Sequence, residues 1–156
     1  MSGALDRFVT AAGALGVAPR VRRFPEGTKT AGDAARAIGC DVAQIVKSLV
    51  FVADGRPVLA LASGRNRVDL RKLAALTGAE DVRRATPEEV RAATGFAIGG
   101  TPPFGVGKAI LPTFIDNALV DFDEVWAAAG TPDAVFPMAP ADLIRLTGGT
   151  VVDLAE

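Results

Sequence analysis

Apolar residues near the N-terminus recur at the three- and four-residue spacing of a helix. The pattern predicts an amphipathic helix over residues 4–16, whose apolar face would hold Leu5, Phe8, Val9, Ala12 and Leu15. Helix-start and helix-stop residues predict four more helices and one shorter helical turn. The helices are expected between Thr30 and Gly39, from Asp69 through Leu76, over residues 87–94 and from Pro140 to near Gly148, and the turn begins at Asp41.

Apolar runs between turn residues predict the strands. Residues 48–53 and 57–63 are separated by Asp54-Gly55-Arg56, which is a strong signal for a β-hairpin. Shorter strand segments are predicted at residues 21–24, 109–111, 113–115, 134–138 and 151–154. Residues 123–129 are locally helical by propensity. Strands and helices mixed without regular βαβ alternation indicate the α+β class.

The composition suits one globular domain over residues 1–156. The chain is 49% hydrophobic, has no apolar run of membrane-spanning length and begins with no signal-peptide pattern. Its one cysteine, Cys40, cannot form an internal disulfide, so a cytoplasmic location with no membrane partner is expected. Cys40 is interpreted as a small buried residue rather than a catalytic thiol.

The chain contains no histidine and no tyrosine. Catalytic systems of the Ser-His-Asp and Cys-His types are therefore excluded within it. The commonest zinc ligand is absent as well, and one cysteine cannot build a thiolate site, so no metal is expected. General acid–base chemistry would have to use Lys, Asp, Glu, water or the substrate itself.

The formal net charge of −1 hides an asymmetry along the chain. Residues 1–91 carry fifteen Lys or Arg against ten Asp or Glu, whereas residues 92–156 carry two against eight. A basic face of this kind could meet a polyanion such as a nucleic acid. The alternative, which charge alone leaves open, is a set of solvated faces that attract the acidic half.

Two features stand out as candidate chemistry. Lys47 is the only charged residue in the apolar run 45–52, where a cation is costly unless it reaches a surface or has a function. The segment Gly99-Gly100-Thr101-Pro102-Pro103-Phe104-Gly105 combines conformational freedom with rigidity. Such a loop can hold its remaining N–H groups toward an anion or a developing oxyanion. The alternative is a rigid turn between two strands.

Other candidate residues also have a purely structural interpretation. The segment Ser63-Gly64-Arg65-Asn66-Arg67 could hold a phosphate, or it could be a polar connector before the helix that begins at Asp69. Ser48 could be an ordinary strand hydroxyl. Phe24 could belong to the core, or it could be an aromatic platform beside a ligand.

Six sequence blocks, in order along nearly the whole chain, share their pattern with a known family. They are residues 30–35, 44–51, 63–70, 85–90, 94–105 and 146–149. The block around Lys47 together with Gly99-Gly100-Thr101-Pro102-Pro103 is the most specific part. On these blocks the chain resembles the YbaK/EbsC-type aminoacyl-tRNA editing family, which is related to the editing insertion domain of bacterial prolyl-tRNA synthetases.

The resemblance implies a fold and a reaction. The fold would be a single compact α+β domain with a curved, mixed β-sheet, partly barrel-like and surrounded by helices, in which residues 123–129 form a strand. We prefer this strand to the helix because propensity is a weak guide. The reaction would be hydrolysis of a mischarged small amino acid from tRNA, with tRNA-Pro as the favoured substrate. The implied partners are the acceptor end of aminoacyl-tRNA and prolyl-tRNA synthetase, and not DNA; no cofactor is implied.

The resemblance also implies roles for individual residues. Lys47 would hold the phosphate or ribose region of the terminal nucleotide, and the backbone of Gly99 and Gly100 would face the scissile carbonyl. The residues implied to bind the substrate are Phe24, Thr28, Ser48, Ser63, Thr101, Pro102 and Pro103. Arg65 and Arg67 would contact the tRNA.

The chain departs from the family pattern at several positions. Phe24 stands where some members have a tyrosine, and Asp133 stands near a position where others have a histidine. These departures leave two other interpretations open. One is a non-catalytic module that binds tRNA or a nucleotide in the same cleft, and the other is an interaction domain that docks on a synthetase.

Overall fold

Three of the five helices begin at a residue whose side chain caps them, and four end at a glycine. In the computed structural model, which describes residues 3–24, 28, 30–107 and 111–156, the helices are α1 (Ala4–Ala14), α2 (Ala31–Ile38), α3 (Leu70–Thr77), α4 (Pro87–Thr94) and α5 (Pro140–Thr147). Two 3₁₀ helices, η1 (Val42–Gln44) and η2 (Asn117–Asp121), accompany them. Thr86 shows the local cause, because its hydroxyl accepts the N–H of Glu89 while the Glu89 carboxylate accepts the N–H of Thr86.

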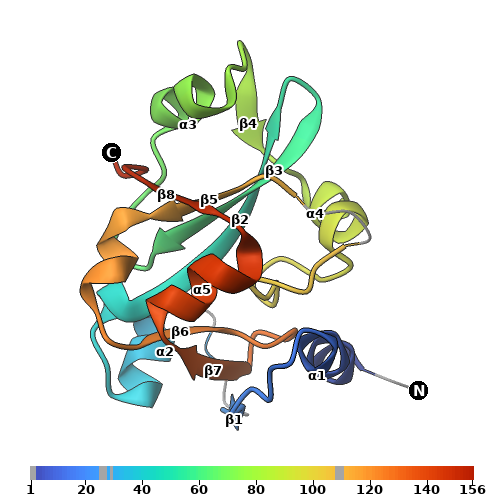
Figure 1. Cartoon of the computed structure of the whole chain (residues 1–156), viewed down its shortest axis with the longest axis vertical. Helices are drawn as coiled ribbons and strands as arrows, with labels where there is room; N and C mark the ends of the chain where they lie inside the picture. Colours follow the sequence, from blue (N-terminus) through green and yellow to red (C-terminus); the bar gives the residue numbers. More distant parts are fainter. Residues whose placement is uncertain (1–2, 25–27, 29, 108–110) are drawn as a thin grey trace.

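Eight described strands form one mixed sheet, drawn in Figure 1. They are β1 (Arg22–Arg23), β2 (Ile45–Ala53), β3 (Arg56–Ser63), β4 (Val82–Arg84), β5 (Thr113–Asp116), β6 (Val125–Ala128), β7 (Ala134–Met138) and β8 (Thr150–Val152). Their order is β1-β7-β6-β2-β3-β5-β8, with β4 paired to β2. The β2–β3 hairpin is antiparallel, whereas β2–β6, β3–β5 and β5–β8 are parallel.

Strand β2 changes neighbours along one of its edges. Its first two residues pair with β6, and its last three pair with β4. Between these pairings, residues 47–49 face no described strand on that edge. The carbonyl of Val50 accepts the N–H of Ala85 on this side, so the backbone groups of Ser48, two residues earlier, point the same way. The sheet therefore has a gap in its pairing beside Ser48.

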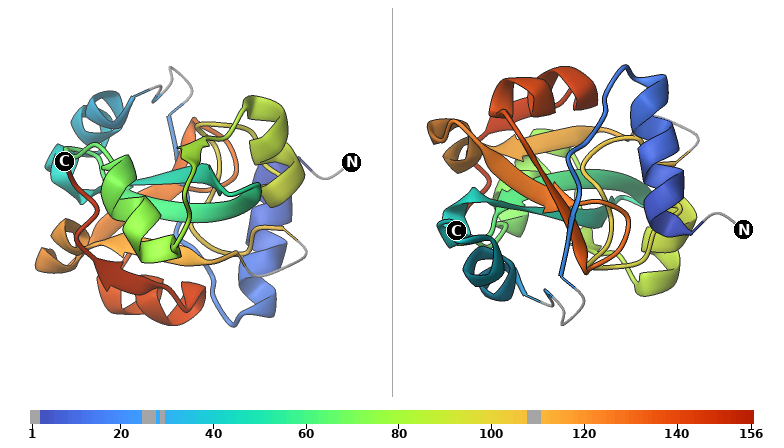
Figure 2. Two further views of the ribbon diagram at one scale, coloured as in Figure 1. Left: turned by 90° about the horizontal axis from the view of Figure 1, so that it is seen from above. Right: turned by 90° about the horizontal axis from the view of Figure 1, so that it is seen from below.

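The main hydrophobic core lies under the β2–β3 face that carries Val46, Val50 and Leu61. Phe8 of α1, Phe104 and Phe136 of β7 meet there with ring centroids 5.0–5.8 Å apart. Figures 1 and 2 show α1 and α2 on opposite sides of the molecule, with β6 and β7 between them. This core thus packs against the face of β2 to which the side chain of Ser48, between Val46 and Val50, also belongs.

Most predicted elements are confirmed, and the exceptions are short. Residues 125–128 form strand β6, which confirms the strand that the family resemblance implies. The helix that propensity alone predicts over residues 123–129 is wrong. Strand β4 was not predicted. The prediction of a strand at 109–111 falls mostly outside the described residues, and Leu111 lies outside any strand. No described helix could cross a membrane, because none is both long and apolar enough.

Candidate active site

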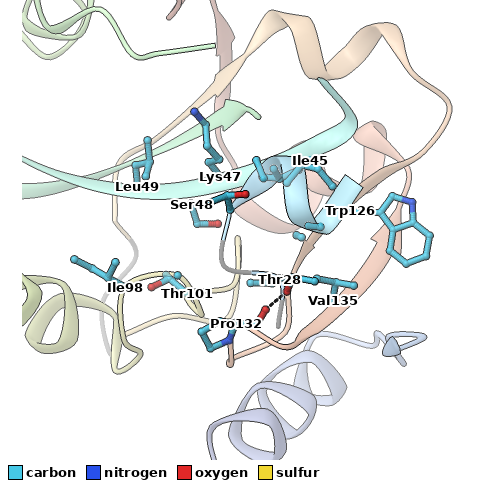
Figure 3. Close-up of a pocket in the computed structure, with 17 residues that line it drawn as sticks. Thr28, Ile45, Lys47, Ser48, Leu49, Ile98, Thr101, Trp126, Pro132 and Val135 are labelled. Carbon is cyan, nitrogen blue, oxygen red and sulfur yellow. Dashed lines mark hydrogen bonds between the residues drawn. The ribbon is translucent and has the colours of Figure 1, made fainter. Parts of the chain in front are cut away.

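A cavity of about 280 Å³ lies where β2 has no neighbouring strand. Its walls come from β2, from β6, from the first turn of α2 and from two segments around residues 98–101 and 132 (Figure 3). Mostly apolar side chains line it, among them Ala31, Ala34, Ile98 and Val135. The wall therefore offers a small apolar space with only a few polar groups.

Lys47 and Ser48 leave β2 in opposite directions because side chains alternate along a strand. Figure 3 shows Ser48 directed toward Ile98 and Thr101, whereas the ammonium of Lys47 points away from them. The Nζ of Lys47 donates a hydrogen bond of 2.5 Å to the backbone carbonyl of Asn66. The hydroxyl of Ser48 therefore lies on the cavity side of β2, and the ammonium of Lys47 lies on the other side of the strand.

The surroundings of Lys47 lower its pKa from the ordinary value. The largest cause is burial, and Arg84 and then Arg67 add repulsion, while the Asp116 carboxylate opposes the shift. Within the described ranges, no carboxylate forms a salt bridge with this ammonium. Three cations thus share one region, which favours an anionic ligand such as phosphate.

The hydroxyls around the cavity differ in their hydrogen bonding. The hydroxyl of Thr28 donates to the carbonyl of Pro132, and that of Thr101 donates to the carbonyl of Ala97 at 3.0 Å. The Oγ of Ser48 is buried and has no hydrogen-bond partner among the described residues. A buried polar group without a partner costs about 1–3 kcal/mol, so Ser48 is the hydroxyl that a ligand would satisfy.

The predicted glycine pair splits into two structural roles. Gly99 has φ +85° and lines the cavity. Gly100 does not line the cavity: its N–H donates to the carbonyl of Ala97 at 3.1 Å, and a Cβ on it would lie 2.8 Å from the carbonyl oxygen of Gly130. Gly100 therefore allows two loops to pack closely, and Gly99 is the glycine that borders the cavity.

The structure brings five predicted site residues to the cavity wall: Thr28, Lys47, Ser48, Gly99 and Thr101. The remaining predicted residues do not line it: Phe24, Ser63, Arg65, Arg67, Gly100, Pro102 and Pro103. Phe24 lies 5.1 Å from the guanidinium of Arg22, which also lies over Trp126. The Ser63 hydroxyl is buried and donates to Ala43, and Pro103 lines a separate groove beside α1 and α5. Arg65 and Arg67 are exposed.

Sequence reasoning missed the opposite wall. Residues 126–128 of β6 and Pro132 complete the cavity, although their sequence carries no polar signal of a site. Only the parallel pairing of Ile45 with Trp126 and Val46 with Ala127 brings this wall to β2. Among the described residues, no group of three or more His, Cys, Asp and Glu side chains is arranged to hold a metal ion.

Cys40 lies outside the cavity wall, in the small cluster beside Ile45 and Trp126. Burial raises the pKa of its thiol, and the Asp41 carboxylate raises it further. A raised pKa leaves less thiolate at neutral pH, so iodoacetamide should alkylate folded Cys40 more slowly than the unfolded chain. Cys40→Ser should leave ester hydrolysis unchanged. Loss of hydrolysis in a folded Cys40→Ser variant would contradict this interpretation.

The fold and the site define an α+β domain that has a small apolar cavity and a lysine on the strand beside it. Residues 25–146 match the model of the family described as "Aminoacyl-tRNA editing domain". This match covers most of the chain, and the protein belongs to that family.

Relatives and a solved structure agree with this assignment. The chain is 29% identical over 132 residues, 84% of its length and 80% of the relative's, to the "Putative Cys-tRNA(Pro)/Cys-tRNA(Cys) deacylase EbsC" of Enterococcus faecalis. It is 36% identical over 125 residues to a proline–tRNA ligase of Solidesulfovibrio magneticus. That match covers 79% of this chain but only 21% of the ligase. A crystal structure described as "a putative trans-editing enzyme for prolyl tRNA synthetase" superposes with a TM-score of 0.93 and 48% identity, covering 100% of this chain and 99% of the other.

Proposed function

We propose that the protein is an aminoacyl-tRNA deacylase that acts in trans and removes a mischarged small amino acid, with tRNA-Pro as its favoured substrate. Its family membership and its relatives support the reaction class. The observation that carries the proposal is the cavity beside Ser48, with the ammonium of Lys47 at the same edge of β2. A cavity for the amino acid and a cation for the nucleotide are the two parts that such a substrate needs.

The size of the cavity supports a small amino acid. Alanine side chains from α2 and β6 form much of the wall, and about 280 Å³ suits an aminoacyl group rather than a whole nucleotide. A synthetase separates small apolar side chains by only about 1–3 kcal/mol, so a second hydrolytic site has a physical purpose. The nucleotide would remain outside, on the side of Lys47.

The reaction needs few protein groups. Water attacks the acyl carbon, the bond from that carbon to the ribose oxygen breaks, and the ribose oxygen receives the proton. Backbone N–H groups at Gly99 and at the open edge of Ser48 are the candidate donors to the developing oxyanion. Among the described residues, no Asp or Glu lines the cavity. We therefore assign activation of the water to the substrate itself, through the vicinal ribose hydroxyl of the tRNA.

Lys47 would contribute through charge. The ammonium of Lys47 has three N–H donors and uses one of them to bind the Asn66 carbonyl. The other two can donate to a phosphate or ribose oxygen. The exposed side chains of Arg65 and Arg67 extend from the two residues on either side of Asn66, where they would follow the tRNA backbone. Contacts of this kind weaken as salt concentration rises.

A panel of charged tRNAs tests the proposal. Wild-type protein is mixed with tRNA-Pro carrying alanine, cysteine, serine, threonine or proline, and release of each amino acid is timed against the uncatalysed rate. We expect fast release of a small wrong amino acid, while prolyl-tRNA is spared. No release from any of the five would overturn the tRNA-Pro assignment. Tight binding of uncharged tRNA-Pro without release from any charged tRNA would replace the deacylase with a binding module.

A further inference from the structure

Asp116 is the one charged side chain that is fully buried in the described part of the chain. It is the last residue of β5 and caps η2. Its carboxylate forms no salt bridge there and is held by N–H donors. Burial of a charge is expensive, so the position calls for a role that an apolar side chain would not perform.

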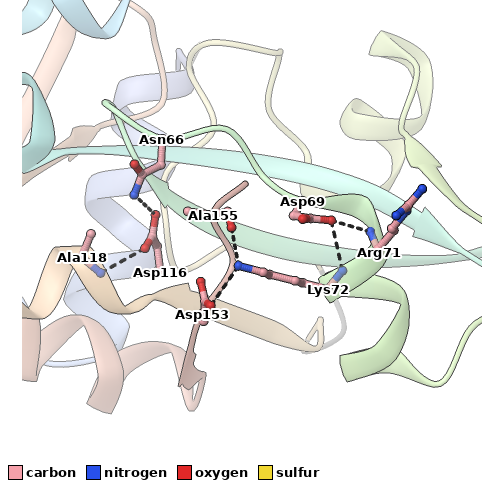
Figure 4. Close-up of polar contacts among 8 residues, drawn as sticks. All are labelled: Asn66, Asp69, Arg71, Lys72, Asp116, Ala118, Asp153 and Ala155. Carbon is pink, nitrogen blue, oxygen red and sulfur yellow. Dashed lines mark hydrogen bonds and ion pairs between the residues drawn. The ribbon is translucent and has the colours of Figure 1, made fainter.

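The Asp116 carboxylate holds three segments together. Its Oδ2 accepts the backbone N–H of Ser63 and the side-chain amide of Asn66, each at 3.0 Å, and its Oδ1 accepts the N–H of Ala118 at 3.0 Å. Figure 4 shows Asn66 and Ala118 approaching the carboxylate from two sides. An amide at this position would present an NH₂ group to at least one of these donors.

Two of these bonds fix both ends of one turn. The N–H of Asn66 donates to the carbonyl of Ser63 at 2.9 Å, which closes the turn over residues 63–66. The Asp116 carboxylate accepts the backbone N–H of Ser63, the first residue of the turn, and the side-chain amide of Asn66, the last residue. The carbonyl of that last residue, Asn66, accepts the ammonium of Lys47 at 2.5 Å. The position of Asp116 is therefore transmitted to Lys47 through one residue.

We propose that Asp116 is a positioning residue that, through Asn66, holds the ammonium of Lys47 in place beside β2, on the side that points away from Ile98 and Thr101. The proposal rests on the proposed deacylase function and adds a residue to its machinery. Asp116 does not touch the substrate. Arg65 lies within the same turn and Arg67 directly follows it, so the carboxylate also fixes the backbone from which these two side chains extend.

Charge gives the carboxylate a second effect on Lys47. Burial, Arg84 and Arg67 all lower the pKa of Lys47, and Asp116 is the group that raises it. Neutralising Asp116 should therefore lower the pKa of Lys47 further. A role of Asp116 in packing alone, with no effect on the surroundings of Lys47, would leave that pKa unchanged.

Three variants test the proposal by deacylation kinetics. Asp116→Asn removes the charge, Asn66→Ala removes only the bond from the carboxylate to the last residue of the turn, and Asp69→Asn is the matched control. Asp69 also accepts backbone N–H groups, from Arg71 and Lys72, but it does not bind the 63–66 turn. We expect kcat/KM to fall about tenfold in the first two variants and to stay near wild type in the control.

A double-mutant cycle identifies the route of the effect. In a Lys47→Met background, Asn66→Ala should cause no further loss, because the side chain through which it acts is gone. Independent, additive losses would overturn the proposal. Asn66→Ala keeps the charge and two of the three carboxylate bonds, so it remains informative even when Asp116→Asn fails to fold.

An NMR titration of Lys47 separates this proposal from the proposed function. The Lys47 side chain is labelled and its pKa is measured in wild type, Asp116→Asn and Asp69→Asn. A lower pKa in Asp116→Asn alone supports the positioning role, even for a protein that releases no amino acid. An unchanged pKa in folded Asp116→Asn would overturn it, even for an active deacylase.

Discussion

Lys47→Ala should lower kcat/KM for release of the edited amino acid about a hundredfold or more, the scale at which one preorganised charged contact in a catalytic site acts. The physical reason is that this ammonium is partly buried, is fixed by a hydrogen bond to Asn66 and forms no salt bridge with a described carboxylate. The measurement is single-turnover deacylation of the misacylated tRNA that the wild-type protein hydrolyses fastest.

Two further substitutions separate charge from shape. Lys47→Met keeps an unbranched side chain of similar length and should lose as much activity as Lys47→Ala. Lys47→Arg keeps the charge and should retain part of the activity, although a planar guanidinium fits the Asn66 carbonyl less well. Activity of Lys47→Met within about twofold of wild type would show that the charge has no part in the reaction.

Loss of activity in these variants should not reflect unfolding. The pKa of Lys47 lies below its ordinary value in the folded protein, so the unfolded chain holds this proton more tightly. The charged lysine therefore opposes folding at neutral pH, and this opposition fades as pH rises toward 10.5, the ordinary lysine pKa. Lys47→Met should accordingly unfold at the same temperature as wild type or at a higher one.

Local signals in the sequence predicted most of the elements. Asp54-Gly55 defined the β2–β3 hairpin, and Thr30, Asp41, Asp69 and Thr86 each cap a helix or 3₁₀ turn that the sequence placed there. Lys47 was identified in the same way, because it is the only charged residue of the apolar run 45–52 and a charge among apolar residues needs a particular environment. These features depend on neighbours a few residues apart, which the sequence shows directly.

Features that depend on distant contacts could not be predicted in the same way. Residues 125–128 have helical propensity, and only pairing with β2 and β7 makes them a strand. The short strand β4 has three residues and exists because it pairs with Phe51–Ala53. The roles of Asp116 and Asn66 arise from bonds across 50 residues, and no local pattern marks them.

The glycine pair shows the same limit within a single motif. The sequence identified Gly99 and Gly100 together, and both are glycines for a structural reason, but the reasons differ. Gly99 needs a positive φ beside the cavity, whereas Gly100 needs the absence of a side chain against the 130–131 loop. Pro132, which follows that loop, is part of the cavity wall. Contact between the two loops therefore sets the width of the cavity.

Gly100→Ala should accordingly impair both stability and activity. The new Cβ would lie 2.8 Å from the carbonyl oxygen of Gly130 and 2.9 Å from the Cα of Thr131, and backbone atoms cannot rotate away as a side chain can. Overpacking of this kind costs about 1–3 kcal/mol of unfolding free energy. Displacement of the wall by several tenths of an ångström to an ångström should lower kcat/KM about a hundredfold.

Gly13→Ala is the matched control for this substitution. Gly13 lies in α1 with no atom within 4 Å of an added Cβ, so the same change there should leave activity intact and the melting temperature equal or higher. Thermal unfolding and single-turnover deacylation are measured on both variants. A Gly100→Ala protein that melts and reacts as Gly13→Ala does would show that the two loops tolerate a methyl group. The close contact between them would then not determine the shape of the cavity.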